Sequence, residues 1–199
     1  MKSINIKENE QNNVVIDSNI YVSYVVGYRI WSLRLNELIL RSLLFTSHHD
    51  NEKWPYRESL EFKCYTNYLG ELSPHCFCGI YSFNGEVKGL YIPSLGLGYI
   101  MICGTVNQWG KVIVCEYGYR SEFAYPNEIT HFVCNKCWKP IRNVKDGTVA
   151  KDKIVELPIV CINCVSKESV YTTLQQNFKD ICSKLSNLYA IPVLDIKNF

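Results

Sequence analysis

Two stretches in the second half of the chain decide its interpretation, Cys134-Asn135-Lys136-Cys137 and Cys161-Ile162-Asn163-Cys164. Each is a Cys-x-x-Cys pair, in which a tight turn directs two sulfurs toward one centre. Two such pairs supply the four thiolates of a tetrahedral zinc site that has no open position for catalysis. Thiolates are soft ligands, so zinc or iron is expected rather than magnesium or calcium. The spacing therefore predicts one structural zinc ion in a zinc ribbon.

A redox dithiol is the alternative for these cysteines. A redox Cys-x-x-Cys motif normally stands alone at the start of a helix, so two motifs at this spacing favour a metal. The segment between them is a short hairpin that buries too little apolar surface to fold unaided. We therefore expect the zinc ion to stabilise the ribbon rather than to take part in chemistry.

The predicted ribbon is more basic than the rest of the chain. Residues 134–167 carry seven basic and three acidic side chains, a local charge of +4 in a chain whose formal net charge is +2. The basic residues are Lys136, Lys139, Arg142, Lys145, Lys151, Lys153 and Lys167. A basic hairpin of this kind can contact phosphates. The alternative is a solvated hairpin whose lysines keep the protein soluble.

The region from residue 14 to residue 128 is rich in short β-branched and aromatic segments, which are typical of strands. Residues 99–106 and 111–117 flank Asn107-Gln108-Trp109-Gly110, and we predict a turn there. Residues 119–125 predict a third strand. This pattern indicates an antiparallel meander that forms a small barrel or a curled sheet.

The C-terminal region, residues 129–199, is predicted to contain the zinc ribbon and one amphipathic helix. Apolar residues between Lys167 and Tyr189 recur at helical spacing, Ser166 can cap that helix, and Pro192 prevents its continuation. The polar residues 1–13 are expected to form a loose N-terminus. The predicted fold class is therefore α+β.

Neither a membrane span nor a signal peptide is predicted. No segment reaches the ~18 uninterrupted apolar residues of a membrane helix, and the polar N-terminus lacks an apolar signal core. We therefore expect a cytoplasmic protein whose ten cysteines are thiols or metal ligands rather than disulfides.

A second group of metal-ligating residues lies upstream of Gly79. Cys76 and Cys78 place two sulfurs on one side of an extended segment, and Cys64 and His75 could complete four ligands. This spacing is not a common zinc pattern. A Cys/His nucleophile pair is another alternative, although no partner acid or oxyanion motif accompanies it. Buried thiols in a β core are the simplest interpretation.

The segment from residue 109 to residue 126 combines aromatic and charged residues. Aromatic walls with a few fixed charges suit a planar polar ligand such as a base or a nucleotide. The candidate ligand-binding residues are Trp109, Glu116, Tyr119, Arg120 and Glu122. Gly118 would let a ligand or a neighbouring backbone approach closely. The alternative is a core hairpin with a buried Arg–Glu pair.

Several motifs in residues 27–126 resemble a family of small bacterial and phage proteins without an assigned role. The resemblance is carried by Cys76-Phe77-Cys78-Gly79-Ile80-Tyr81, by Trp109-Gly110, and by Gly118-Tyr119-Arg120-Ser121-Glu122. It implies no activity. A fainter similarity, based on strand order and Gly104-Thr105-Val106, is to small barrels of the PUA and ASCH type, which bind RNA or modified bases.

These observations predict a non-enzymatic, zinc-containing binding module whose ligand is nucleic acid or a nucleotide. The alternative is a protein-interaction module in which the ribbon is only a scaffold. A metal- or cysteine-dependent enzyme at residues 75–78 is the third class, and it has the least support in the sequence.

Overall fold

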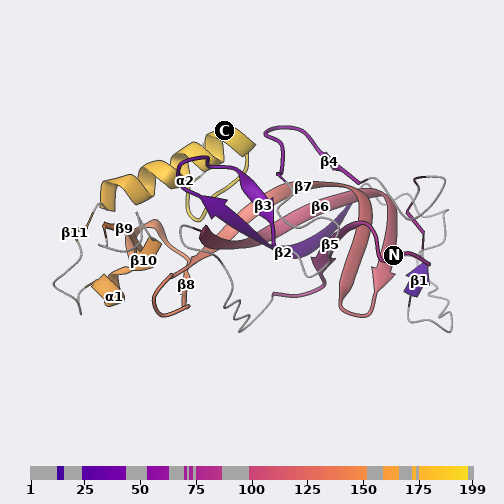
Figure 1. Cartoon of the computed structure of the whole chain (residues 1–199), viewed down its shortest axis with the longest axis horizontal. Coiled ribbons are helices and arrows are strands. Elements are labelled where there is room, and N and C mark those ends of the chain that lie inside the picture. The colour runs from indigo at the N-terminus through magenta and orange to yellow at the C-terminus, as the bar shows by residue number, and fades with distance from the viewer. Residues whose placement is uncertain are drawn as a thin grey trace. The chain divides into compact units, whose positions relative to one another are not determined.

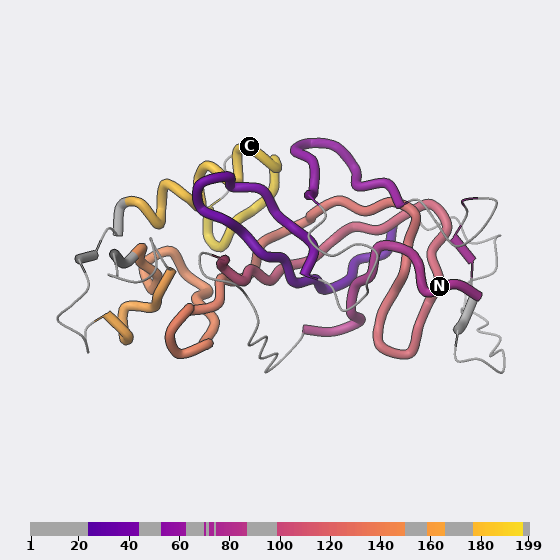
Figure 2. The backbone as a smooth tube through the Cα atoms, viewed as in Figure 1, coloured from indigo at the N-terminus to yellow at the C-terminus, as the bar shows by residue number. Residues whose placement is uncertain are grey.

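The computed structural model of the chain is shown in Figures 1 and 2. It describes residues 13–15, 24–43, 53–62, 70, 72–73, 75–86, 99–151, 159–165, 172–173 and 175–196. The chain forms two compact units, each built from separated segments. Unit 1 contains Met1–Arg29, Ser59–Lys88 and Val106–Tyr125, and unit 2 contains Ile30–Glu58, Gly89–Thr105 and Pro126–Phe199. The domain boundaries expected near residues 13 and 128 stay predictions.

The structure is mostly antiparallel sheet with few helices, which agrees with the expected α+β class. Eight strands form one sheet of order β1-β6-β2-β5-β7-β4, in which β3 pairs with β2, β8 pairs with β7, and β6 also pairs with β7. The strands are β1 (Asn13–Val15), β2 (Val25–Arg34), β3 (Leu40–Ser42), β4 (Leu60–Glu61), β5 (Ile80–Phe83), β6 (Tyr99–Cys115), β7 (Gly118–Val133) and β8 (Pro140–Ile141). Closure of this sheet into a barrel stays a prediction.

Strand β6 continues through residues 107–110, where we predicted a turn, so that prediction is wrong. The chain turns instead at Glu116 and Tyr117, and Figure 2 shows β6 and β7 running side by side. Within β6, Gly110 has a φ of +74°, a left-handed backbone conformation that glycine adopts at little energetic cost.

The side chain of Gln108 is fully buried in β6, and its polar amide is stable there because it has hydrogen-bond partners. Its amide nitrogen donates to the Ile80 carbonyl at 2.7 Å and to the Ser121 hydroxyl at 2.9 Å. Its amide oxygen accepts a hydrogen bond from the hydroxyl of Ser82. The partners come from β5 and β7, so the buried amide crosslinks the strands of unit 1.

In unit 1, β5 lies antiparallel to β7, with Ile80 opposite Ser121 and Phe83 opposite Gly118. A β-carbon added to Gly118 would lie 1.8 Å from the Ser82 carbonyl oxygen. The close approach that this glycine permits is therefore that of a neighbouring backbone.

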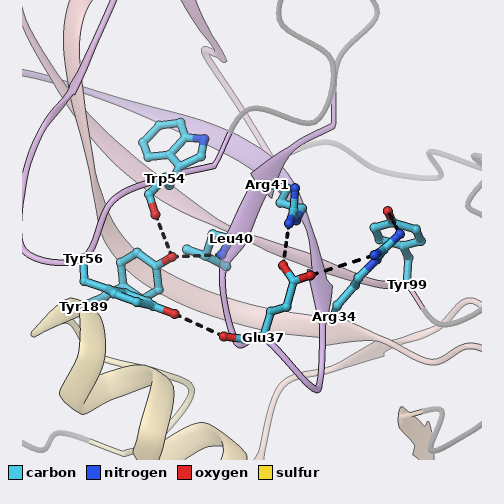
Figure 3. Close-up of polar contacts among 8 residues, drawn as sticks. All are labelled: Arg34, Glu37, Leu40, Arg41, Trp54, Tyr56, Tyr99 and Tyr189. Atoms are coloured by element: carbon cyan, nitrogen blue, oxygen red, sulfur yellow. Dashed lines mark hydrogen bonds and ion pairs between the residues drawn. The ribbon is translucent and has the colours of Figure 1, made fainter.

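In unit 2, β2 and β3 form a hairpin covered by aromatic side chains. Trp31 and Trp54 are fully buried and pack edge to face, with ring centroids 5.6 Å apart. The buried hydroxyl of Tyr189 accepts from the Leu40 amide at 2.9 Å and donates to the Trp54 carbonyl at 3.0 Å, as Figure 3 shows. These two bonds attach the C-terminal helix to the hairpin.

The rest of unit 2 contains a second, three-stranded sheet with helical segments beside it. Strand β9 (Gly147–Lys151) is central and pairs antiparallel with both β10 (Ile159–Cys161) and β11 (Thr172–Thr173). The helical elements are η1 (Val144–Asp146), α1 (Ile162–Val165) and α2 (Gln175–Tyr189). Figure 1 shows α2 as the longest of them.

Helix α2 is amphipathic, as the sequence predicts. Phe178, Cys182, Leu185 and Tyr189 are fully buried and recur every three or four residues. Phe178 packs edge to face on Phe132, with centroids 5.2 Å apart. It lies against Gly147, where an added β-carbon would come within 2.3 Å of the Phe178 ring. The absence of a side chain at residue 147 thus makes room for the helix.

The start of α2 differs from the prediction. The helix was expected to begin at Lys167, but Thr172 and Thr173 pair with β9 and the helix begins at Gln175. The expected cap at Ser166 lies outside the described residues. The helix ends as predicted, because Ala190 adopts a φ of +50° and Pro192 follows. Among the described residues, no helix is long and apolar enough to cross a membrane.

Candidate functional site

The first cysteine pair lies in the turn between β7 and β8. The Cys134 amide donates to the Lys139 carbonyl, and the Trp138 amide donates to the Cys134 carbonyl, both at 3.0 Å. Trp138 has a φ of +60°, an uncommon conformation for a residue other than glycine. The two hydrogen bonds and this left-handed residue close a tight turn that brings Cys134 and Cys137 together.

The second pair lies where β10 ends and α1 begins. Cys161 is the last residue of β10, and Cys164 follows within the single turn of α1. The Asn135 amide donates to the Ile159 carbonyl at 2.9 Å. The Cys161 amide donates to the sulfur of Cys134 at 3.3 Å. These two bonds connect the cysteine pairs directly.

The four sulfurs gather at one point, as the sequence predicted. All four lie within 4.8 Å of one another. The Sγ atoms of Cys134 and Cys164 are 3.9 Å apart, and those of Cys137 and Cys161 are 3.7 Å apart. A tetrahedral zinc ion with thiolates at about 2.3 Å separates neighbouring sulfurs by about 3.8 Å. These two separations match that value, so this cluster can hold a metal ion.

The thiols of Cys134, Cys137 and Cys164 have shifted pKa values. Burial raises the pKa of Cys134. Burial also acts to raise the pKa of Cys137, but the Lys139 amide and the neighbouring sulfurs outweigh it and lower that pKa to about 7. Burial and the neighbouring sulfurs raise the pKa of Cys164. A bound divalent cation would favour the thiolate form of all four cysteines.

The surface beside the cluster combines exposed apolar and basic side chains. Trp138, which follows Cys137, is 40% exposed, and Ile162, which follows Cys161, is 42% exposed. Exposed basic residues in this part of the chain are Lys136, Lys139, Arg142 and Lys145, and the nearby acid Asp146 is also exposed. Sequence reasoning missed Trp138 and Ile162, although each directly follows a cysteine of the cluster.

The upstream cysteine–histidine group is only partly described. Cys64 lies outside the described residues, His75 is exposed, Cys76 is half-buried and Cys78 is buried. Among the residues that the structure describes, the only group of three or more ligating side chains close enough to hold a metal is the four-cysteine cluster. A second metal site therefore stays a prediction.

Arg120 belongs to the predicted ligand-binding set, and its side chain is buried. It donates hydrogen bonds to the carbonyl oxygens of Cys76 and Cys78, the latter at 3.1 Å, and lies over the Tyr81 ring. In the described part of the chain, ion pairs join Glu37 to Arg34 and Arg41, and Arg120 forms none with Glu116 or Glu122. The structure therefore does not contain the Arg–Glu pair considered as the structural alternative.

The other four residues of that set lie in β6, in β7 and in the turn between these strands. Trp109 stacks on Phe123, with centroids 6.1 Å apart. Glu122 accepts a hydrogen bond from the Lys111 amide at 2.8 Å. Glu116 is exposed in the turn before β7, and Tyr119 is half-buried in β7 opposite Ser82.

These contacts give Trp109, Arg120 and Glu122 packing partners within unit 1. Binding of a ligand by the set stays a prediction.

Three comparisons with known proteins were made. A scan against family models, a search of curated proteins and a search of solved structures each gave no match. The resemblance of residues 27–126 to small bacterial and phage proteins therefore stays a prediction.

Proposed function

We propose that Cys134, Cys137, Cys161 and Cys164 hold one structural zinc ion. The proposal is supported by the match between the sulfur separations and a tetrahedral thiolate site. Four protein ligands leave no coordination position for a substrate, so the ion stabilises the ribbon rather than catalysing a reaction. A cytoplasmic location would keep these cysteines reduced and therefore able to bind the metal.

We further propose that the chain is a non-enzymatic module that binds nucleic acid at the metal centre. The observation that carries this function is the exposed indole of Trp138, located between the exposed basic residues Lys136 and Lys139. Basic side chains attract phosphates, and an aromatic ring provides a surface on which a base can stack.

A labelled mixed-sequence oligonucleotide tests this function by fluorescence anisotropy. Affinity is expected to fall steeply between about 50 and 200 mM salt, because binding releases counterions from the phosphates. Removal of the metal with a chelator is expected to abolish binding, since the ribbon positions these side chains. A nucleotide ligand would instead give a thermal shift with mononucleotides. Absence of binding by the zinc-loaded protein at low salt would refute the nucleic-acid function.

A protein-interaction role is the second candidate function, and Phe77 of unit 1 is the observation that favours it. Its side chain is 87% exposed. The carbonyls of Cys76 and Cys78 accept hydrogen bonds from Arg120, and the Phe77 carbonyl accepts one from the Tyr81 hydroxyl. Three successive carbonyls are thus fixed by the body of the unit. A rigidly presented aromatic side chain suits an apolar pocket on a partner protein.

A Phe77→Ser variant tests this second function. The substitution is expected to leave the melting temperature unchanged, because the side chain makes little contact within the chain. A protein partner retained at high salt by the wild type should be lost by Phe77→Ser and kept by Tyr117→Ser, which alters another exposed aromatic residue. Equal retention by all three proteins would count against docking at Phe77.

A further inference from the structure

We infer that the nucleic acid bound at the metal centre is single-stranded and that one unpaired base stacks on Trp138. This inference rests on the proposed nucleic-acid function and specifies its ligand. The residues involved, here called the knuckle surface, are exposed and lie within about five positions of Cys137 or Cys161 in the sequence. They are Lys136, Trp138, Lys139, Arg142 and Ile162.

Trp138 differs from the other tryptophans of the chain in its exposure. Trp31 and Trp54 are fully buried, and Trp109 is half-buried and stacked on Phe123. The 40% exposure of Trp138 leaves much of its indole in solvent. Trp138 is therefore the tryptophan most accessible to an external ring.

The backbone of Trp138 is held in place. Its amide donates to the Cys134 carbonyl at 3.0 Å, and the residues on either side are Cys137 and Lys139. Lys139 accepts a further backbone hydrogen bond from Cys134. With the neighbouring cysteine bound to the metal, the turn would lose little backbone freedom when a ligand binds. An aromatic ring on such a turn binds at low entropic cost.

Ile162 is a second exposed apolar residue that directly follows a cysteine of the cluster. Trp138 and Ile162 follow Cys137 and Cys161, whose sulfurs are 3.7 Å apart. Ile162 is 42% exposed, so apolar side chains from both cysteine pairs reach solvent beside the metal centre.

The charged residues close to Trp138 in the sequence are mostly basic, which is complementary to the negative phosphates of a nucleic-acid backbone. Within residues 134–147, the structure describes four exposed basic side chains and one exposed acidic side chain, Asp146. Lys136 and Lys139 lie two residues and one residue from Trp138. Phosphates that flank a stacked base would therefore meet positive charge along the same turn.

Single-stranded nucleic acid fits this surface better than a duplex does. In a duplex both faces of each base are occupied by stacking within the helix, so an exposed indole has no free base face on which to stack. In a single strand the bases can be splayed out and stacked on an aromatic side chain. Single-stranded DNA and single-stranded RNA share this chemistry, and the experiment below distinguishes them.

The test compares wild type, Trp138→Ala and Trp138→Tyr with single-stranded and duplex oligonucleotides of one sequence, in DNA and RNA forms. Trp138→Ala is expected to weaken single-strand binding about 5- to 150-fold, the effect of losing one stacked base. Trp138→Tyr should retain most of the affinity because it keeps an aromatic ring. Tyr117→Ala, which removes an exposed aromatic of unit 1, should bind like the wild type. Zinc content measured for each variant controls for loss of the ribbon.

Two further readouts separate stacking from charge. The intrinsic fluorescence of the wild type should be quenched by the single strand, and this quenching should largely disappear in Trp138→Tyr while binding persists. Lys136→Ala should reduce the salt dependence of log affinity by about 0.7 if it contacts one phosphate, whereas Trp138→Ala should leave that slope unchanged.

Equal affinity of the wild type for single strand and duplex, or an unchanged affinity in zinc-loaded Trp138→Ala, would overturn the inference and leave nucleic-acid binding standing. Binding of neither form would overturn both proposals. A preference for RNA over DNA would support the inference and assign the natural strand.

Discussion

The amide nitrogen of Cys161 donates a hydrogen bond to the sulfur of Cys134 across 3.3 Å. This contact joins the two cysteine pairs through their own backbone and side chain. A hydrogen bond of this kind favours the thiolate at Cys134 and so opposes the burial that raises the pKa of this thiol. The second cysteine pair thus helps to prepare the first for a metal ion.

Zinc removal is expected to unfold the ribbon. Elemental analysis should give close to one zinc per chain, and Cys137→Ser should lower that value because three ligands bind zinc more weakly. The ribbon of this variant should become sensitive to proteolysis. Chelator-treated protein that retains its full protease resistance would contradict the structural role of the metal.

Cys78→Ser is the matched control for the metal analysis. Cys78 is buried in unit 1, outside the four-cysteine cluster. If Cys78 is a core thiol, the substitution should leave the zinc content unchanged. It should lower the free energy of unfolding by about 1–3 kcal/mol, because a hydroxyl is harder to bury than a thiol. A fall in metal content by one ion would instead reveal a second site that includes Cys78.

Tyr189→Phe is expected to loosen the attachment of α2 to the β2–β3 hairpin. It removes the hydroxyl that bridges the Leu40 amide and the Trp54 carbonyl, leaving both groups buried without that partner (Figure 3). The free energy of unfolding should fall by about 1–3 kcal/mol. Denaturant titration measures this change, and Tyr56→Phe serves as a control because its hydroxyl makes a single, half-buried bond to Glu37. An equal effect of the two substitutions would contradict the bridging role.

Gln108→Leu is expected to destabilise unit 1. The substitution keeps a similar volume but leaves the Ile80 carbonyl and the hydroxyls of Ser82 and Ser121 without their amide partner. The expected loss is about 1–3 kcal/mol in the free energy of unfolding. Hydrogen exchange at residues 80–83 and 118–121 should accelerate in this variant while exchange in the ribbon does not. Unchanged exchange in β5 would show that the amide does not hold the strands together.

Glu37→Gln is expected to change the acid stability of unit 2. The hydrogen bond from Arg41 is the main cause that lowers the pKa of Glu37 below 4.5, with further lowering by Lys53 and Arg34. Because the folded pKa is depressed, the carboxylate stabilises the fold above about pH 4.5, and this contribution is lost as the pH falls through the folded pKa. Wild type should therefore melt at a higher temperature than Glu37→Gln at pH 7, and the difference should shrink by pH 3. A constant difference across this range would exclude the titration of Glu37 as its cause.

Much of the candidate metal centre could be predicted from the sequence because its chemistry is local. Two Cys-x-x-Cys pairs identify the ligands, since a tight turn between paired cysteines brings two sulfurs together whatever the rest of the fold does. The buried face of α2 could be predicted for the same reason, because residues such as Phe178, Cys182 and Leu185 follow the helical period.

The start of α2 and the length of β6 could be established only from the tertiary structure. Thr172 and Thr173 leave the predicted helix because strand β9 offers them backbone partners at Lys151 and Ala150. Gln108 belongs to a strand because Ile80, Ser82 and Ser121 satisfy its buried amide. In both cases the deciding hydrogen bonds come from residues distant in sequence, which local propensity does not register.

The sequence by itself determined which side chains can bind a metal and which helix face is buried, because both depend on spacing along one segment. Only the tertiary structure decided which side chains remain accessible. Arg120 looked available to a ligand, but the carbonyls of Cys76 and Cys78 hold it inside unit 1. Trp138 was not part of any prediction from the sequence, yet it directly follows a cysteine of the cluster and is 40% exposed. Exposure depends on what packs against a side chain from elsewhere in the chain, and that is a property of the folded molecule.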